Sequence, residues 1–217
     1  MSTFPNSPRL LKGGLVVLDP SSGAVQKVIP LQYNPDTLTR TLQIKGVGQD
    51  SGDRIEGLRL TGPAVETIKV EAEIDATDQL ELADSQATTA GLHPLLAVLE
   101  VLVHPASATL QANNAAASSG TLEIIASSAA LTVFVFGPKR IAPVRITEFS
   151  ITEEAFDVAL NPIRAKLSLG MRVLSVDDLG FGAQGGGLFM SYLQAKEQLA
   201  SQYQAGTFGA LGITGLP

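Results

Sequence analysis

Regular alternation of apolar and polar residues marks two stretches of the chain. Over 163–173 the apolar residues share one parity and the polar residues the other, and the same period of two returns over 66–75. Successive side chains of a strand point to opposite faces, so this alternation predicts two strands with one buried and one wet face. The residues predicted to be buried are Ile68, Val70, Ala72 and Ile74 in one strand, and Ile163, Ala165, Leu167, Leu169, Met171 and Val173 in the other.

Shorter apolar or alternating segments predict further strands. They are 14–18, 25–33, 37–45, 122–125, 131–136 and 141–157. Proline-containing turn signals follow several of them, at Asn34-Pro35-Asp36, Gly137-Pro138 and Asn161-Pro162. Hairpin-length connections of this kind favour an antiparallel meander.

Two positions refine this prediction. Pro30 has no N–H to give to a ladder, which places the strand 25–33 at a sheet edge or at a bulge. The apolar parity changes between Ile146 and Phe149, which predicts a β-bulge near Thr147–Glu148.

Helical spacing is confined to two segments. Leucines recur at spacings of three and four over 92–103, with Pro94 in the first turn, and a second amphipathic helix is predicted from Leu188 to Gln204. The segments 46–62, 76–90 and 111–120 are polar or rich in small residues and are expected to be loops, the first ordering against a partner.

The predicted fold is mainly β with one inserted helix, an antiparallel β-sandwich or partly open barrel that ends in a short C-terminal helix. The expected parts are an arm over 1–12, a β domain over 13–179, a glycine-rich hinge over 180–187, and a helix with a tail over 188–217.

Composition narrows the possible functions. The chain has 217 residues, a net charge of −6 and no cysteine, so nucleic-acid binding, disulfides and cysteine-ligated metal are not expected. The first residues lack the apolar core of a signal peptide, and the apolar run 92–103 is too short to span a bilayer. We therefore expect assembly in the cytoplasm without direct membrane insertion.

No catalytic constellation stands out. His93 and His104 lie beside prolines at the ends of the predicted helix, too far apart in sequence for a HExxH pair, and are expected to be capping or surface residues. Adjacent Glu153 and Glu154 would point to opposite faces of a strand. We expect no enzyme activity, no cofactor and no metal.

Charge on the wet strand faces is the remaining signal. The strand 163–173 carries Arg164, Lys166 and Arg172, while the strand 66–75 carries an acidic set with one lysine, namely Glu66, Lys69, Glu71, Glu73 and Asp75. A basic face on one copy could meet an acidic face on the next in a head-to-tail ring, or could face a lumen. The alternative that both faces are merely solvated stays open.

An ordered set of short motifs resembles a known family. The set comprises 31–38 (LQYNPDTL), 71–78 (EAEIDATD), 91–96 (GLHPLL), 136–140 (FGPKR), and 151–156 (ITEEAF) continuing to 160–165 (LNPIRA). Over about residues 10–180 the chain resembles the contractile-injection-system tube protein family, the baseplate hub or tube-initiator proteins of extracellular phage-tail-like particles.

This resemblance implies a phage-tail-tube-like fold of two packed antiparallel sheets plus a helix, and a hexameric ring that joins the spike to the inner tube. The implied partners are copies of the chain itself, the inner-tube protein, the spike protein and other baseplate subunits. Many relatives continue into a LysM module, which nothing after Leu188 resembles, so peptidoglycan binding is not carried over. Two other hypotheses remain: a main inner-tube subunit, and a stand-alone adhesion or ligand-binding β-domain.

Overall fold

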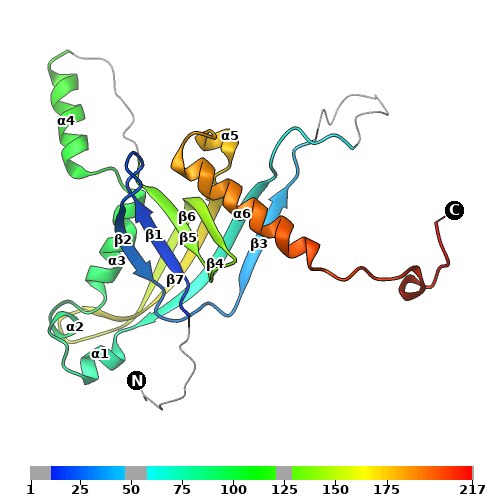
Figure 1. Cartoon of the computed structure of the whole chain (residues 1–217). Coiled ribbons are helices and arrows are strands. Elements are labelled where there is room, and N and C mark those ends of the chain that lie inside the picture. The colour runs from blue at the N-terminus through cyan, green and yellow to red at the C-terminus, as the bar shows by residue number, and fades with distance from the viewer. Residues whose placement is uncertain (1–10, 47–57, 121–128, 217) are drawn as a thin grey trace.

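A computed structural model describes residues 11–46, 58–120 and 129–216. Its strands form one seven-stranded antiparallel sheet in the order β2-β1-β5-β6-β7-β4-β3 (Figure 1). The strands are β1 (Gly14–Leu18), β2 (Val25–Pro30), β3 (Leu38–Gln43), β4 (Val65–Asp75), β5 (Leu131–Val135), β6 (Ile141–Phe156) and β7 (Pro162–Val173). The mainly β prediction is confirmed. The described strands form one sheet that is not closed, rather than the two packed sheets that the family resemblance implies.

The sheet edges agree with the sequence. β2 and β3 each pair with one neighbour in the described part of the chain, so Pro30 lies at an edge as predicted. The long β6–β7 hairpin shifts register between Ile146 and Glu148, which confirms the bulge at Thr147. The prediction of a strand over 122–125 falls outside the described residues, as do most of the arm 1–12 and of the loop 46–62.

One face of this sheet, which we call the core face, carries the hydrophobic core. Along β4 and β7 the exposure alternates as predicted, with Ile68, Leu167 and Met171 at 2% or less. Helix α3 (His93–Glu100), continued by the 3₁₀ turn η1 (Val101–Val103), packs Leu96 and Leu99 into the same core. The predicted helix over 92–103 is therefore confirmed.

The expected loop over 76–90 is wrong, because two short helices form there. They are α1 (Thr77–Glu81) and α2 (Ser85–Ala90). The Asp84 carboxylate caps α2 by accepting hydrogen bonds from the backbone N–H groups of Gln86 and Ala87, both at 3.0 Å. In the sequence, Asp84 was the signal that could have indicated the start of α2. Neither helix has a hydrophobic stripe that would have predicted it.

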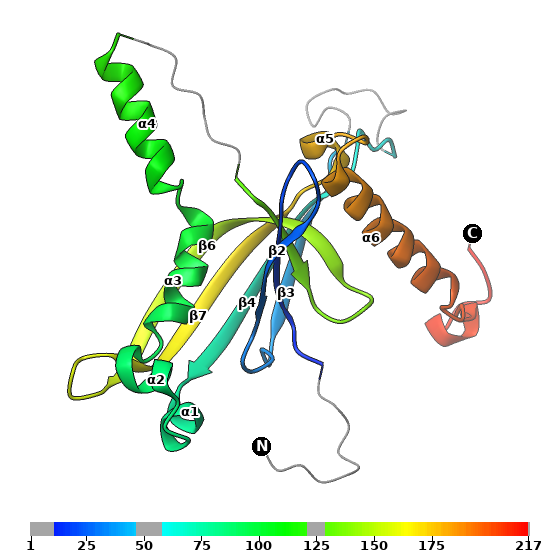
Figure 2. The same ribbon diagram turned by 60° about the vertical axis from the view of Figure 1, so that its left-hand side comes forward.

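The expected flexible segment 111–120 is also wrong. It belongs to helix α4 (Ser107–Ser118), an alanine-rich helix with no buried residue that stands away from the sheet (Figures 1 and 2). Among the described residues no single helix is long and apolar enough to cross a membrane. The bent pair His93–Val103 and Ser107–Ser118 meets that length and composition test only when taken together.

The C-terminal region leaves the sheet as a helix. After the short α5 (Val176–Leu179), α6 (Gln184–Ser201) begins four residues before the predicted start, so Gly185, Gly186 and Gly187 are helical rather than part of a hinge. Gly185 and Gly186 are buried, and a Cβ on Gly186 would lie 2.0 Å from the carbonyl oxygen of Gly180. Beyond α6 the chain runs outward to the 3₁₀ turn η2 (Phe208–Leu211) (Figure 2).

Candidate functional site

The predicted surface residues lie together on the sheet face opposite the core, which we call the second face. β7 pairs with β4 on one side and with β6 on the other, so its basic residues lie between acidic neighbours. Each row across β4, β7 and β6 holds one residue from each strand. The three rows are Asp75, Arg164 and Glu154; Glu73, Lys166 and Thr152; and Glu71, Ser168 and Ser150. We call this surface of β4, β7 and β6 the charged half of the second face.

Most of its charges are paired within the chain. Arg164 Nε lies 2.9 Å from Asp75 Oδ2, and Lys166 Nζ lies 2.9 Å from Glu154 Oε1. These contacts raise the pKa of both Arg164 and Lys166. Hydrogen bonds from Thr77, with a further one from Arg164, hold the pKa of Asp75 below its ordinary value.

Gly170 permits a third pair. It lies between Lys69 and Glu148 in the register, and Lys69 Nζ reaches Glu148 Oε2 at 2.8 Å across the glycine. A Cβ on Gly170 would come within 2.9 Å of the Glu148 Cβ, so a larger residue would force Glu148 to shift. Because Gly170 has no side chain, Lys69 on β4 and Glu148 on β6 can form an ion pair across β7.

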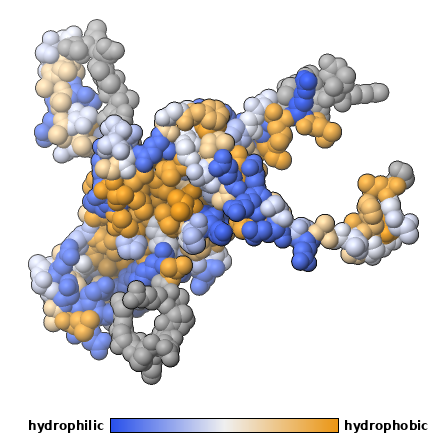
Figure 3. Space-filling model, in the orientation of Figure 1, coloured by the Kyte–Doolittle hydropathy of each residue, from blue (hydrophilic) through white to orange (hydrophobic). Residues whose placement is uncertain are grey.

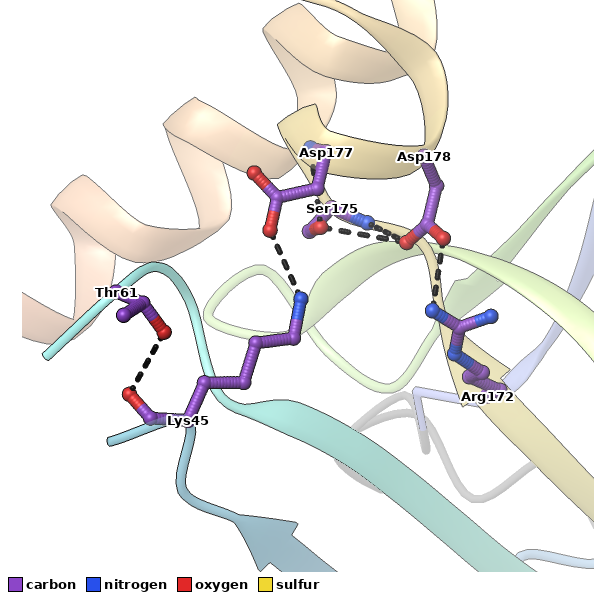
Figure 4. Close-up of polar contacts among 6 residues, drawn as sticks. All are labelled: Lys45, Thr61, Arg172, Ser175, Asp177 and Asp178. Atoms are coloured by element: carbon purple, nitrogen blue, oxygen red, sulfur yellow. Dashed lines mark hydrogen bonds and ion pairs between the residues drawn. The ribbon is translucent and has the colours of Figure 1, made fainter. Parts of the chain in front are cut away.

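At the end of β7 the pairing passes to α5. Arg172 Nη2 lies 2.7 Å from Asp178 Oδ1, while the other oxygen of Asp178 accepts the Ser175 backbone N–H in a capping box (Figure 4). Asp177 binds Lys45 Nζ at 2.9 Å. Arg172 faces Arg145 in the register, so Asp178 offsets a pair of like charges.

The hypothesis of separate basic and acidic faces needs correction. Because β4 and β7 are neighbours, their charges form one surface of mixed sign rather than two complementary ones. Glu66 is not on this surface at all: it shares the parity of Ile68, lies on the core face and is 3% exposed.

Glu66 instead fastens α6 to the sheet. Its carboxylate accepts hydrogen bonds from Arg40 Nε at 2.6 Å, Lys196 Nζ at 2.7 Å and the Tyr192 hydroxyl at 2.9 Å. Burial alone would raise the pKa of Glu66, but the contacts with Arg40 and Lys196 outweigh it and the pKa is lowered. Burial, together with the Glu66 charge, raises the pKa of Tyr192 to about 12.

Beyond β6 the same second face becomes apolar. The register continues from Arg145 and Pro143 on β6 to Val133 on β5, Val16 on β1 and Val28 on β2. We call this part the aliphatic half, made of Val16, Leu18, Val25, Val28, Pro30, Leu131, Val133, Val135 and Ile141. Leu179 and Leu188 cover one end of it, while Val25 and Val28 remain 61% and 62% exposed.

Comparisons with known proteins add little. No protein-family model and no curated protein sequence matches the chain. One solved structure, described as the tail of an empty GTA particle with C6 symmetry, aligns at 14% identity over 74% of this chain and 90% of that chain, with a TM-score of 0.27. A likeness this weak carries no argument about fold or function.

A groove of about 970 Å³ lies over the charged half, bounded on its other side by Lys12 and the residues 32–37. The Gln32 side chain closes one end by donating to the Asp75 carbonyl and accepting from the Asp75 N–H. Among the described residues Glu71 and Glu73, which line the groove, form no ion pair. Glu73 still lies opposite Lys166 in the register and adds to the negative field around Arg164 and Lys166.

The histidines stand apart from both halves. His93 and His104 are exposed near the two ends of the α3–η1 segment, as predicted. Within the described parts of the chain no group of three or more His, Cys, Asp or Glu residues is placed to hold a metal ion.

Proposed function

We propose that the chain is a structural, non-catalytic subunit that assembles with copies of itself into a hexameric ring of a phage-tail-like contractile particle. In this proposal the ring lies where the baseplate spike meets the inner tube. Its partners are the inner-tube protein, the spike protein and other baseplate subunits. It assembles in the cytoplasm and can leave the cell within the particle.

Large apolar side chains on segments that stand away from the sheet carry this proposal. Val158 and Leu160 at the β6–β7 turn are 107% and 77% exposed, Leu110 on α4 is 54% exposed, and Leu211 beyond α6 is 74% exposed (Figures 1 and 2). Val158 and Leu160 lie close together in one turn, and neighbouring exposed apolar side chains suit a contact with another protein. The sheet edges at β2 and β3, unpaired among the described residues, and the family resemblance of the motifs support the same role.

The β6–β7 turn is built to present its apolar residues in one fixed conformation. Asp157 accepts hydrogen bonds from the backbone N–H groups of Ala159 at 2.7 Å and Asn161 at 2.8 Å. Ala155 and Leu160 hold positive φ values of 54° and 64°, which cost a residue with a Cβ about 1–2 kcal/mol. A turn fixed in this way, with Val158 between, suits a repeated contact between subunits.

Negative-stain imaging and native mass spectrometry of the purified chain test the proposal. Sixfold rings or tail-like particles are the expected result, and a monodisperse monomer that never enters particles would contradict it. Cross-linking then separates the two positions within a particle. Cross-links to the spike protein support the initiator position, whereas cross-links only to tube subunits support a main inner-tube subunit.

The groove over the charged half favours a second candidate, a stand-alone ligand-binding β-domain. Its volume of about 970 Å³ lies at the upper end of the range of small-molecule sites. Saturable binding of a small polar ligand by a monomeric chain would support this candidate over the ring subunit.

A further inference from the structure

The segment 202–216 beyond α6, which we call the C-terminal tail, is exposed along its whole length. Its large apolar residues are Tyr203, Phe208, Leu211, Ile213 and Leu216, with exposed fractions between 42% and 79%. No Asp, Glu, Lys or Arg occurs after Glu197. The tail therefore combines apolar side chains with an absence of charge, which favours burial rather than a solvated state.

The tail keeps a local structure of its own. Around η2 the backbone N–H of Ile213 bonds to the carbonyl of Phe208 at 3.2 Å, and that of Ala210 bonds to Thr207 at 3.0 Å. This turn brings Phe208 and Ile213 near each other without help from the sheet. The tail is thus a small apolar unit that stays exposed because it does not pack against the described part of its own chain.

A matching surface exists at the other end of α6. Leu188, in the first turns of that helix, packs against the aliphatic half, and the rest of the helix runs away from it. At 1.5 Å per residue the 18-residue helix carries the tail roughly 27 Å from the surface where α6 begins. Figure 3 shows apolar surface over β2, β1 and β5 and again on the tail, with polar α6 between.

We propose that the C-terminal tail of one copy covers the exposed β2 side of the aliphatic half, at Val25 and Val28, on a second copy. The nine residues of the aliphatic half include no charged side chain, so the two surfaces can meet without desolvating a charge. The direction of α6 points the tail away from its own aliphatic half (Figures 1 and 2). The same chain thus supplies both sides of the contact.

Such a contact is heterologous, because donor and acceptor are different parts of the chain. A heterologous contact repeats from copy to copy and closes into a ring when the rotation allows. This inference deepens the proposed ring subunit by naming a contact that joins its copies. It needs only copies of this chain, whereas the proposed function also needs a tail-like particle.

Two full-length variants test the contact. Leu211→Asp places a charge in the tail, and Val28→Asp places one in the aliphatic half on an edge strand, where the fold tolerates it. Each variant is expected to weaken self-association, measured by sedimentation, by about tenfold or more. Leu82→Asp and Val101→Asp change equally exposed residues outside both surfaces and are expected to associate as the unmodified chain does.

Mixing the variants identifies the occupant. Leu211→Asp keeps an intact aliphatic half and Val28→Asp keeps an intact tail, so together they are expected to form a one-to-one complex and nothing larger. If Val28→Asp weakens association and Leu211→Asp does not, the aliphatic halves pack on each other and the proposal is wrong. A chain that is monomeric at all concentrations overturns it too, since the tail then has no second copy to bind.

Cross-linking supplies an independent readout, because the chain has no cysteine of its own. Full-length Val28→Cys and Leu211→Cys chains, mixed and treated with a short bis-maleimide, are expected to give a heterodimer, and Val101→Cys in place of Val28→Cys is expected not to. Rings that form without this cross-link would contradict the inference and leave the proposed function intact. The cross-link in a chain that never enters particles would support the inference and contradict the proposed function.

Discussion

The second face of the sheet divides into a charged half over β4, β7 and β6 and an aliphatic half over β5, β1 and β2. In the charged half Arg164, Lys166 and Lys69 each find a carboxylate within the chain. In the aliphatic half Leu18, Leu131 and Val133 are buried within the chain, whereas Val25 and Val28 are more than half exposed. Charge draws attention to the first surface, yet the second is the one whose exposed groups gain most from a partner.

The largest expected effect lies directly beneath the charged half. Leu167 is 2% exposed, so Leu167→Asp would place a carboxylate in the core and is expected to lower the free energy of unfolding by more than about 4 kcal/mol, a large share of the stability of a typical domain. Urea denaturation followed by circular dichroism measures this. Thr152→Asp introduces the same group on the exposed side opposite Lys166 and is expected to change stability by no more than about 0.5 kcal/mol. Equal effects would mean that the two sheet faces are misassigned.

The next effect concerns α6, which begins at the aliphatic half and is fastened to β3 and β4 by Glu66. Glu66→Gln leaves Arg40 and Lys196 without a counter-charge, and we expect a loss of about 3 kcal/mol in the free energy of unfolding. The matched change Glu73→Gln removes an exposed carboxylate and is expected to cost no more than about 0.5 kcal/mol. If the two variants are equally stable, α6 is held by Phe189 and Tyr192 alone.

Acid should weaken the same attachment. The folded pKa of Glu66 lies below its ordinary value of 4.5, so its stabilising contribution is complete above about pH 4.5 and is lost as the pH falls through the folded pKa. The unmodified chain is therefore expected to lose more stability between about pH 5 and pH 3 than Glu66→Gln. Parallel pH profiles for the two proteins would exclude Glu66 as a source of acid sensitivity.

The smallest effect on folding is expected in the charged half. Arg164→Glu with Arg172→Glu replaces two partly exposed ion pairs by like charges, at a cost of about 1 kcal/mol per site that added salt reduces. We expect the folded subunit to survive and ring or particle assembly, followed by negative stain, to be impaired. Normal particles from the doubly reversed chain would show that the charged half is only solvated.

Local periodicity predicted the buried faces of β4 and β7 and the bulge in β6, because a period of two depends only on neighbouring residues. The same parity places Glu66 on the core side with Ile68, and only its acidic side chain argued for the wet side. The unbroken apolar runs 14–18 and 131–136 also carried a signal. A strand that is apolar at every position has both faces covered or in need of cover.

What the sequence could not supply was the pairing of distant segments. Nothing local to 66–75 or 163–173 states that β4 and β7 are neighbours, and this pairing turns two charged faces into one neutralised surface. Helix α4 was missed for a different reason. Its Asn and Ser residues suggest a loop, while alanine's helix propensity operates without any buried stripe to reveal it.

The bulge at Thr147 changes which residues of β6, odd-numbered or even-numbered, lie on each face of the sheet. Before it the odd-numbered residues face the second face, and after it the even-numbered residues do, so one strand supplies aliphatic Ile141 and acidic Glu154 to the same surface. The Thr147 hydroxyl donates a hydrogen bond to the Gly170 carbonyl at 3.1 Å, which holds the extra residue against β7. Deleting that one residue would remove the bulge and let Glu148 follow Ile146 in a regular ladder, so Phe149 and Ile151 would stay on the core side. The change of parity in the sequence is thus the trace of one inserted residue, and the apolar residues on both sides of it reach the same core.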